Sequence, residues 1–284
     1  MSIKITSLNV KGLKSPNKRR LLLRTLNLAK SDIAFIQETH INKAAKIRLT
    51  DHRYPMAISA HSVTKRNGVS ILLRKTCPFR VTSEVCDSDG RYVLVSGSMH
   101  ASPCHLLNIY ALNARSEQFW VDMTDLVTSL PRGLVIVGGD MNAVPCAAAD
   151  RRSPAGLERV PGPSGQDKAF YTFLRRTDLL DAWRVLHPDE RDFTFYSAPH
   201  GSYSRINLFL CNLTCMAMVL RTDIHSITWS DHADISLQLA VPHSSGPWMW
   251  KLNASLLRDP EVVAQAQLAL EQYFSENAME DVSP

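Results

Sequence analysis

The sequence predicts an α/β sandwich, because apolar segments of strand length alternate with amphipathic segments of helix length. In the first half, strand-like segments occupy residues 3–10, 32–38, 68–74, 92–99, 105–112 and 134–138. Helical segments follow the Ser-Pro pair at 15–16 and span 115–129 and 167–186. Shorter strand-like segments lie at 193–197, 204–210, 216–220, 225–229 and 234–241. Residues 145–165, rich in Pro, Gly and small residues, predict a surface loop.

The composition is that of a globular protein, with 45% hydrophobic and 21% charged residues. The six cysteines form no CxxC pair and have no zinc-ligand spacing, which predicts reduced, mostly structural thiols. The N-terminus lacks the apolar core of a signal peptide, and no apolar run approaches membrane-spanning length. We therefore expect a nuclear or cytoplasmic protein that is not secreted and has no membrane partner.

Positive charge is concentrated at the N-terminal end of the chain. Residues 1–50 contain eleven Lys and Arg but two acidic residues, whereas residues 244–284 carry a net charge of −4. A basic segment of this kind suits a polyanion-binding surface, although a solvated helix face has the same composition.

The stretch "VGGDMNAVP" (137–145) ends an apolar strand with two glycines, followed by Asp140 and Asn142. Side chains two residues apart in an extended segment point to the same side. Gly, Asp and Asn are common in turns, but strand ends are also where open α/β sheets place their sites. The stretch therefore predicts either a turn or a functional site.

Polar side chains stand at other expected strand ends as well. Asn9 ends the first strand, Glu38 follows the second, and Tyr110 lies near the end of a later one. Asp231 and His232 follow a strand near the C-terminus. Carboxylate and amide oxygens suit Mg²⁺, which assists phosphodiester hydrolysis by offsetting charge on phosphate oxygens. We therefore predict a Mg²⁺-dependent site, with Mn²⁺ as an alternative ion.

Seven blocks of the sequence occur in a recognisable order: "SLNVKGL", "IAFIQETH", "LLNIYALN", "VIVGGDMNAV", "FTFYS", "SRINLFL" and "SDHADI". They resemble the endonuclease/exonuclease/phosphatase superfamily, and most closely the apurinic-type endonuclease domain of non-LTR (long interspersed element) retrotransposon polyproteins. The resemblance implies a four-layered α/β sandwich over residues 1–243, in which two mixed β-sheets pack face to face between helices. Residues 244–284 would then be a helical linker or tail leading to a reverse transcriptase.

The resemblance also implies roles for individual residues. Glu38 is the principal Mg²⁺ ligand, with Asn9 and Asp231 beside the metal. Asp140 positions or deprotonates the attacking water. The other catalytic residues, which contact the scissile phosphate or orient their neighbours, are Asn142, Tyr110, His232 and Asn207.

One position departs from the family pattern. In the "SRINLFL" block the family has Asp where this chain has Asn207. That Asp accepts a hydrogen bond from the catalytic His and favours its protonated form, whereas an amide supplies no charge. The corresponding Asp-to-Asn change in the serine-protease triad lowers the rate by about 10⁴, which we take as an upper limit. We therefore expect weakened activity.

Double-stranded DNA is the expected partner, because the basic segment directly follows Asn9. The predicted DNA-binding residues are Lys11, Lys14, Lys18, Arg19, Arg20, Thr194, Arg205 and Ser230, with Arg151 and Arg152 as further candidates. The resemblance implies nicking of one strand to expose a 3′-hydroxyl for priming.

Several alternative functions are compatible with the same chemistry. An abasic-site repair endonuclease is the first alternative, and a catalytically impaired DNA-binding module is the second. Lipid and inositol phosphatases share the fold, but the basic segment favours a nucleic-acid substrate. The missing signal peptide argues against a secreted deoxyribonuclease.

Overall fold

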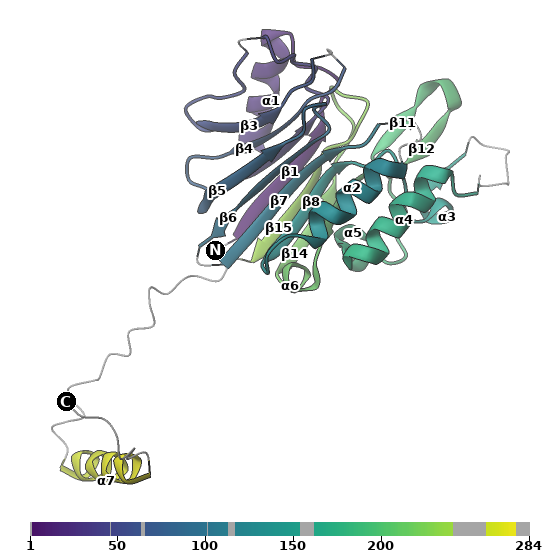
Figure 1. Ribbon diagram of the computed structural model, residues 1–284. Coiled ribbons are helices and arrows are strands. Elements are labelled where there is room, and N and C mark those ends of the chain that lie inside the picture. Colours follow the sequence, from purple (N-terminus) through teal and green to yellow (C-terminus); the bar gives the residue numbers. More distant parts are fainter. Residues whose placement is uncertain are drawn as a thin grey trace. The chain divides into compact units, whose positions relative to one another are not determined.

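The computed structural model describes residues 2–45, 47–63, 66–100, 102–112, 117–153, 162–240 and 260–276. The chain divides into two units, residues 1–243 and 244–284. In the first unit, two six-stranded sheets pack face to face and helices cover their outer faces (Figure 1). The expected four-layered α/β sandwich is therefore confirmed.

The first sheet has the strand order β14-β15-β1-β2-β4-β3. Its strands are β14 (Val219–Ile224), β15 (Ile235–Ala240), β1 (Ser2–Asn9), β2 (Ile33–Gln37), β4 (Val69–Leu73) and β3 (Met56–Ala60). β1 runs parallel to β2 and antiparallel to β15, with Ser7 opposite Ile235. The ends of β1 and β2 and the start of β15 therefore meet at one edge.

The second sheet has the strand order β10-β13-β8-β7-β6-β5. Its strands are β10 (Leu180–Asp181), β13 (Asn207–Cys211), β8 (Leu134–Asp140), β7 (Ser102–Tyr110), β6 (Tyr92–Met99) and β5 (Phe79–Cys86). Tyr110 of β7 and Asn207 of β13 both lie opposite Asp140 of β8. Three predicted site residues thus occupy one row across neighbouring strands.

A small third sheet has the order β11-β12-β9, formed by β11 (Phe195–Ser197), β12 (Ser202–Ser204) and β9 (Arg151–Arg152). The helices of the first unit are α1 (Pro16–Leu28), α2 (Glu117–Thr128), α3 (Ala147–Asp150), α4 (Gly165–Thr177), α5 (Ala182–Leu186), α6 (Leu213–Met216) and the 3-10 helix η1 (Ala198–His200). The second unit contains α7 (Pro260–Glu276). Among the described residues, no helix is both long and apolar enough to cross a bilayer.

Three buried apolar clusters hold the four layers together. They lie between the two sheets (Ile5, Phe35, Phe209), between the second sheet and helices α2 and α4 (Trp120, Phe170, Phe173), and between the first sheet and α1 (Leu22, Leu26). The ring of Trp120 lies 4.7 Å from that of Phe170, centroid to centroid. Burial of these side chains removes apolar surface from water and is the main force that joins the layers.

The two glycines before Asp140 allow the backbone of β8 to fit between its neighbours. A Cβ on Gly138 would lie 2.6 Å from the ring of Phe209, which packs between the sheets. Gly139 has a φ of +140°, and a Cβ there would collide with the carbonyl oxygen of Ile109. The glycines therefore serve close packing of the strand that presents Asp140, in addition to ending it.

Several elements differ from the sequence-based prediction. The edge strands β3 and β5 were not predicted. In the case of β5, most residues are exposed and there is no continuous apolar run. The expected helix 167–186 is divided into α4 and α5, since Asp178 adopts a left-handed φ of +51° and β10 follows. The strand expected at 216–220 begins at Val219, and residues 225–229 form no strand. The expected loop 145–165 contains α3 and β9, and its residues 154–161 lie outside the described part.

Asp167 is expected to contribute strongly to stability. Its carboxylate is 3% exposed, lies 2.7 Å from Arg151 Nη1, and accepts hydrogen bonds from the backbone N–H groups of Val144 and Ser164. Burial by itself raises the pKa of Asp167. The hydrogen bonds from these donors outweigh burial, so the pKa lies below its ordinary value. Asp167→Asn should therefore lower the free energy of unfolding at pH 7 by about 3 kcal/mol, as measured by urea denaturation.

The effect of Asp167→Asn should depend on pH in a defined direction. Because the folded-state pKa is depressed, the carboxylate stabilises the protein above the unfolded-state pKa of about 3.9. That stabilisation is lost as the pH falls through the folded-state pKa. A stability difference between the two proteins that stays constant from neutral pH down through this range would contradict the interpretation.

Candidate active site

The predicted site residues come together at one edge of the sandwich. Asn9 is the last residue of β1, Glu38 directly follows β2, and Tyr110 and Asp140 end β7 and β8. His232 lies just before β15, and its backbone forms a bridge with Phe195 of β11. Both sheets therefore contribute side chains to the same site, as parallel strands that end at one edge allow.

Asn9 links the two sheets at the centre of the site. Its side chain is fully buried, and its Nδ2 donates to Glu38 Oε1 at 2.9 Å and to Asp140 Oδ2 at 2.8 Å. Its Oδ1 accepts a hydrogen bond from the backbone N–H of Lys11 at 3.1 Å. One amide group thus holds two carboxylates, one from each sheet, and offsets part of their repulsion.

Asp140 is the buried carboxylate of the site, with 1% of its surface exposed. Its Oδ1 accepts from the backbone N–H of Asn142 at 3.1 Å, and its Oδ2 lies 3.9 Å from His232 Nε2. Burial raises the pKa of Asp140, although His232, the Asn9 amide and the Asn142 N–H oppose the rise. A carboxyl group with a raised pKa is a stronger base than an ordinary aspartate, which suits proton abstraction from water.

His232 is held by the position that departs from the family pattern. Its Nδ1 lies 2.8 Å from Asn207 Oδ1, and its ring packs against Phe195 with 4.6 Å between centroids. The backbone N–H of Asn207 donates to Thr194 Oγ1 at 3.0 Å, which fixes the start of β13. An amide therefore stands where the resemblance implies a carboxylate, and the imidazole keeps a hydrogen-bond partner.

Two further predicted site residues, Tyr110 and Asn142, have a polar group whose state the structure defines. Tyr110 is 9% exposed, and burial together with the Glu38 and Asp140 carboxylates raises the pKa of its phenol. The phenol is thus a hydrogen-bond donor at neutral pH. Asn142 donates from Nδ2 to the carbonyl oxygen of Ala111 at 2.6 Å, which fixes the orientation of its amide.

Asp231 is paired with a lysine. Its Oδ2 lies 2.7 Å from Lys11 Nζ, and the adjacent Ser230 donates from Oγ to the carbonyl oxygen of Asn9 at 2.6 Å. Burial raises the pKa of Asp231, but the hydrogen bond and charge of Lys11, together with His232, leave it below 3.8. Lys11, predicted to contact DNA, is therefore also the partner of a predicted metal ligand.

A divalent metal ion fits best at Glu38. Its carboxylate is 19% exposed, and its Oε2 lies 3.4 Å from His40 Nε2. Sites for Mg²⁺ often supply one or two carboxylates and leave the other positions to water and phosphate. Asp231 would be the second carboxylate, but it forms an ion pair with the Lys11 ammonium group. In the described part of the chain, no three His, Cys, Asp or Glu side chains group as a metal-binding cluster.

Sequence reasoning missed His40, which contacts Glu38. Burial lowers the pKa of His40, although the Glu38 carboxylate opposes this. The backbone around the site is unusual, because Lys11, Glu38, His40 and Asn142 all have φ between +44° and +53°. Such conformations are uncommon outside glycine and persist where the surrounding structure holds them, often at functional sites. The only signal in the sequence was a histidine two residues after Glu38.

The other predicted basic residues lie on or just before α1. Lys14 and Arg20 are exposed, whereas Lys18 and Arg19 are partly buried. Lys18 Nζ donates to the carbonyl oxygen of Lys11 at 2.9 Å, and Arg19 Nη1 donates to the carbonyl oxygen of Lys14 at 2.6 Å. Lys14 and Arg20 are thus the most accessible of the four, and DNA contact by this group stays a prediction.

Two predicted DNA-binding residues are buried, and for them the prediction is wrong. Arg205 is 1% exposed, and its guanidinium binds Asp150 at 2.8 Å and Asp181 at 2.7 Å. Thr194 is fully buried, and its Oγ1 accepts from the backbone N–H of Asn207. Both side chains stabilise the segment that leads into β13 and cannot reach a DNA surface.

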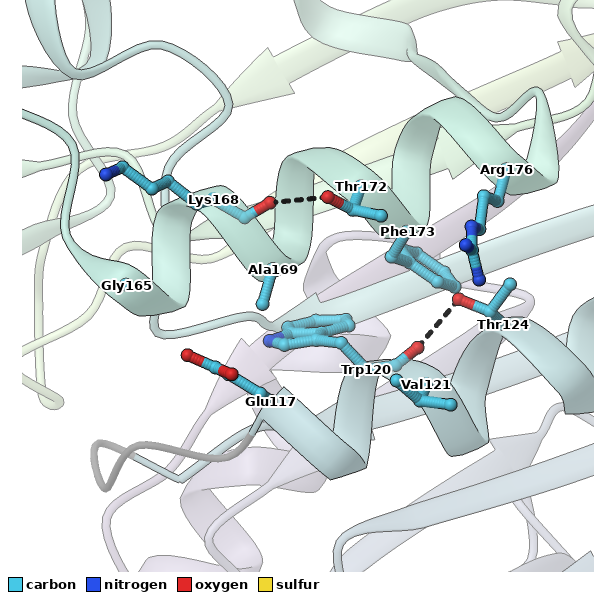
Figure 2. A pocket seen from close by; sticks show the side chains of 10 residues that line it. All are labelled: Glu117, Trp120, Val121, Thr124, Gly165, Lys168, Ala169, Thr172, Phe173 and Arg176. Carbon is cyan, nitrogen blue, oxygen red and sulfur yellow. Dashed lines mark hydrogen bonds between the residues drawn. The ribbon is translucent and has the colours of Figure 1, made fainter.

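A pocket away from the site lies between α2 and α4 (Figure 2). Its volume is about 340 Å³, and Trp120 and Phe173 line it together with Glu117 and Lys168. None of the side chains that converge around Asn9 lines this pocket. It lacks the paired carboxylates and amides that phosphodiester hydrolysis needs, so we exclude it as the candidate active site.

The profile of the Endonuclease/Exonuclease/phosphatase family matches residues 6–232. This match covers most of the chain, which therefore belongs to this family. The matched region extends from β1 to His232 and so includes every strand end that contributes to the site.

Two relatives resemble the chain over most of its length. It is 28% identical over 264 residues to the DNA repair nuclease APEX1 of Danio rerio, covering 84% of this chain and 83% of that protein. It is 23% identical over 265 residues to the transposon TX1 uncharacterized 149 kDa protein of Xenopus laevis, covering 91% of this chain. The chain spans 20% of the length of that transposon protein.

Solved structures share the fold. The AP endonuclease LMAP from Leishmania major superposes with a TM-score of 0.72 at 18% identity, covering 85% of this chain and 88% of that one. The APE2 catalytic domain of Xenopus laevis gives 0.68 at 18% identity, covering 83% and 91%. These likenesses establish the architecture of the sandwich.

Proposed function

We propose that this protein is a divalent-metal-dependent endonuclease that nicks one strand of double-stranded DNA, as in target-primed retrotransposition. The observation that carries the proposal is the Asn9 amide, which joins Glu38 to the buried Asp140, with His232 3.9 Å from Asp140. The likeness to a transposon protein supports the biological context. We further propose that a reverse transcriptase accompanies the nuclease in a larger polyprotein.

The proposed chemistry assigns a task to each side chain. Asp140 takes a proton from a water molecule, whose oxygen bonds to phosphorus as the P–O3′ bond breaks. The departing O3′ takes a proton from solvent water, which leaves a 5′-phosphate and a 3′-hydroxyl. Tyr110, Asn142 and His232 contact the phosphate oxygens and stabilise their developing charge. Glu38 would hold Mg²⁺, or alternatively Mn²⁺, which would further stabilise that charge when bound.

The β11–β12 hairpin extends the proposed DNA-binding surface. Tyr196 and Tyr203 are 38% and 39% exposed, and their rings lie 4.7 Å apart. Arg152 is exposed on the neighbouring β9, and Phe195 of the same hairpin contacts His232. An exposed aromatic pair beside a cation suits contact with bases and phosphates next to the cleaved bond.

Removal of both hairpin tyrosines should weaken DNA binding without changing the chemical step. The double variant Tyr196→Ala/Tyr203→Ala is expected to raise the Kd for duplex DNA by roughly tenfold, as loss of one aromatic contact does. Fluorescence anisotropy measures the Kd, and single-turnover nicking measures the rate. Tyr171→Ala is the matched control, because Tyr171 is 52% exposed on α4. Equal affinities of the double variant and the control would contradict this surface.

Nicking of supercoiled plasmid tests the proposed function directly. We expect open circles with Mg²⁺, none with EDTA, and none from Glu38→Ala, because that variant removes the proposed metal ligand. Calorimetric titration with Mn²⁺ should show that Glu38→Ala also loses metal binding. Cleavage that persists in EDTA, or at an unchanged rate in Glu38→Ala, would contradict the proposal.

A second candidate function is abasic-site repair, supported by the likeness to APEX1 over 84% of this chain. Plasmids with and without abasic sites separate the two functions, since a repair enzyme cleaves only the damaged one efficiently. A third candidate, a catalytically impaired DNA-binding module, is motivated by Asn207. It predicts DNA binding without nicking by the unsubstituted protein.

A further inference from the structure

A small cavity lies beside Asn207, and neither Asp140 nor His232 of the proposed catalytic cluster lines it. Its volume is about 10 Å³, near the lower limit for one water molecule. Asn207 lines it from β13 of the second sheet, Arg205 from the segment just before β13, Thr222 from β14 of the first sheet, and Trp183 from α5. These four side chains are all less than 9% exposed.

Three polar atoms from residues that line this cavity are buried without a hydrogen-bond partner among the residues that the structure describes. They are Arg205 Nη1, Asn207 Nδ2 and Thr222 Oγ1. Buried polar groups without a partner are rare in folded proteins, and three around one cavity indicate a shared ligand. Two are N–H donors and the third is a hydroxyl group, so the ligand must accept at least two hydrogen bonds.

Charge and size favour water over an anion. Arg205 binds Asp150 and Asp181, and Arg184 Nη2 also binds Asp150 at 2.9 Å, so two guanidinium groups already face two carboxylates. This leaves no net positive charge to hold an anion. The cavity also has room for only one water-sized molecule.

We propose that one ordered water molecule fills this cavity. It accepts hydrogen bonds from Asn207 Nδ2 and Arg205 Nη1 and donates one to Thr222 Oγ1. The water fixes the orientation of the Asn207 amide, because Nδ2 is engaged in the cavity and Oδ1 faces His232 Nδ1 at 2.8 Å.

The amide orientation determines which nitrogen of the neutral imidazole carries the proton. With Oδ1 facing the ring, the proton of the neutral imidazole resides on His232 Nδ1, and Nε2, on the side of Asp140, receives the added proton when the ring acts on the phosphate as an imidazolium. A reversed amide would place Oδ1 in the cavity and Nδ2 toward the ring, and the proton would move to Nε2. Asn207 is therefore a positioning residue for His232, and its link to catalysis rests on the proposed function.

Nitrogen-15 NMR of the imidazole and diffraction at about 1 Å test the water site in the unsubstituted protein. We expect an Nδ1–H tautomer for the neutral ring, and density for one water within hydrogen-bond distance of the three atoms. An Nε2–H tautomer, or a cavity into which the amide oxygen points, would overturn the proposal.

Thr222 offers a matched pair of variants. Thr222→Val keeps the shape but removes the hydroxyl that the water bonds to, whereas Thr222→Ser keeps the hydroxyl. We expect Thr222→Val to give a mixture of tautomers and to lower the nicking rate about tenfold, as loss of an orienting partner does, with an unchanged Kd for DNA. Thr222→Ser should keep the single tautomer. Identical spectra of Thr222→Val and the unsubstituted protein would overturn the proposal.

The spectroscopic and diffraction readouts do not require DNA cleavage. A protein with the water and the Nδ1–H tautomer that fails to nick DNA supports this inference and overturns the proposed function alone. A protein that nicks DNA but has the reversed amide supports the proposed function and overturns this inference alone.

Discussion

Asp140→Asn is expected to lower the rate of DNA nicking by roughly 10³-fold at saturating DNA, because an amide cannot take the proton of the attacking water. The side chain is 1% exposed, and its two oxygens accept hydrogen bonds from Asn9 Nδ2 and the backbone N–H of Asn142, so an amide has the shape of the site but gives up one of these two bonds. Affinity for DNA should change little, since Asp140 is buried and offers almost no surface to a bound duplex. Single-turnover cleavage and fluorescence anisotropy separate the two effects.

The pH dependence of nicking supplies a second readout for Asp140. Burial raises the pKa of this carboxyl group above its ordinary value, and its deprotonated form is the proposed base. The rate should therefore rise with pH through a value higher than that of an ordinary aspartate. Asp178→Asn is the matched control, because Asp178 is exposed at the end of α4 and Asn also tolerates its left-handed φ of +51°. Nicking by Asp140→Asn within tenfold of the unsubstituted protein would rule out the role of base.

Asn207→Asp is expected to raise the nicking rate at least tenfold, with about 10⁴ as the upper limit taken from the serine-protease triad. The new carboxylate would accept the hydrogen bond from His232 Nδ1 that Asn207 Oδ1 now accepts at 2.8 Å. It would also supply the negative charge that favours a protonated imidazole beside the phosphate. Single-turnover cleavage of plasmid in Mg²⁺ measures the change.

The gain from Asn207→Asp must depend on the same metal site. The double variant Glu38→Ala/Asn207→Asp should therefore be inactive, which excludes a contaminating nuclease as the source of the extra activity. If Asn207→Asp nicks no faster than the unsubstituted protein, the amide is fully competent and the weakened activity that we predict does not exist.

Local patterns in the sequence were sufficient to predict an α/β sandwich, and the family resemblance added its four layers. Apolar strand segments alternate with helices whose buried residues recur at helical spacing, as Leu22 and Leu26 do in α1. These patterns reflect which face of an element is buried, so they survive without knowledge of the partner element. The edge strand β5 was missed for the same reason, because most of its residues are exposed and leave no apolar pattern.

The convergence of the strand-end residues was also predictable. Asn9, Glu38, Tyr110 and Asp140 each stand at the end of a strand, and parallel strands of a sandwich end at a common edge. A residue at the end of one of these strands is therefore predicted to lie at that common edge. The sequence alone could therefore indicate which side chains meet, and the family blocks predicted a role for each of them.

Only the tertiary structure decided which polar side chains are exposed and which are paired. Arg205 was predicted to bind DNA but neutralises Asp150, 55 residues away, and Lys11 pairs with Asp231, 220 residues away. The cavity beside Asn207 likewise depends on Thr222, which β14 contributes from the other sheet. Burial and pairing arise from contacts between segments far apart in the chain, and a charged residue has the same local sequence signature on a surface as in a buried ion pair.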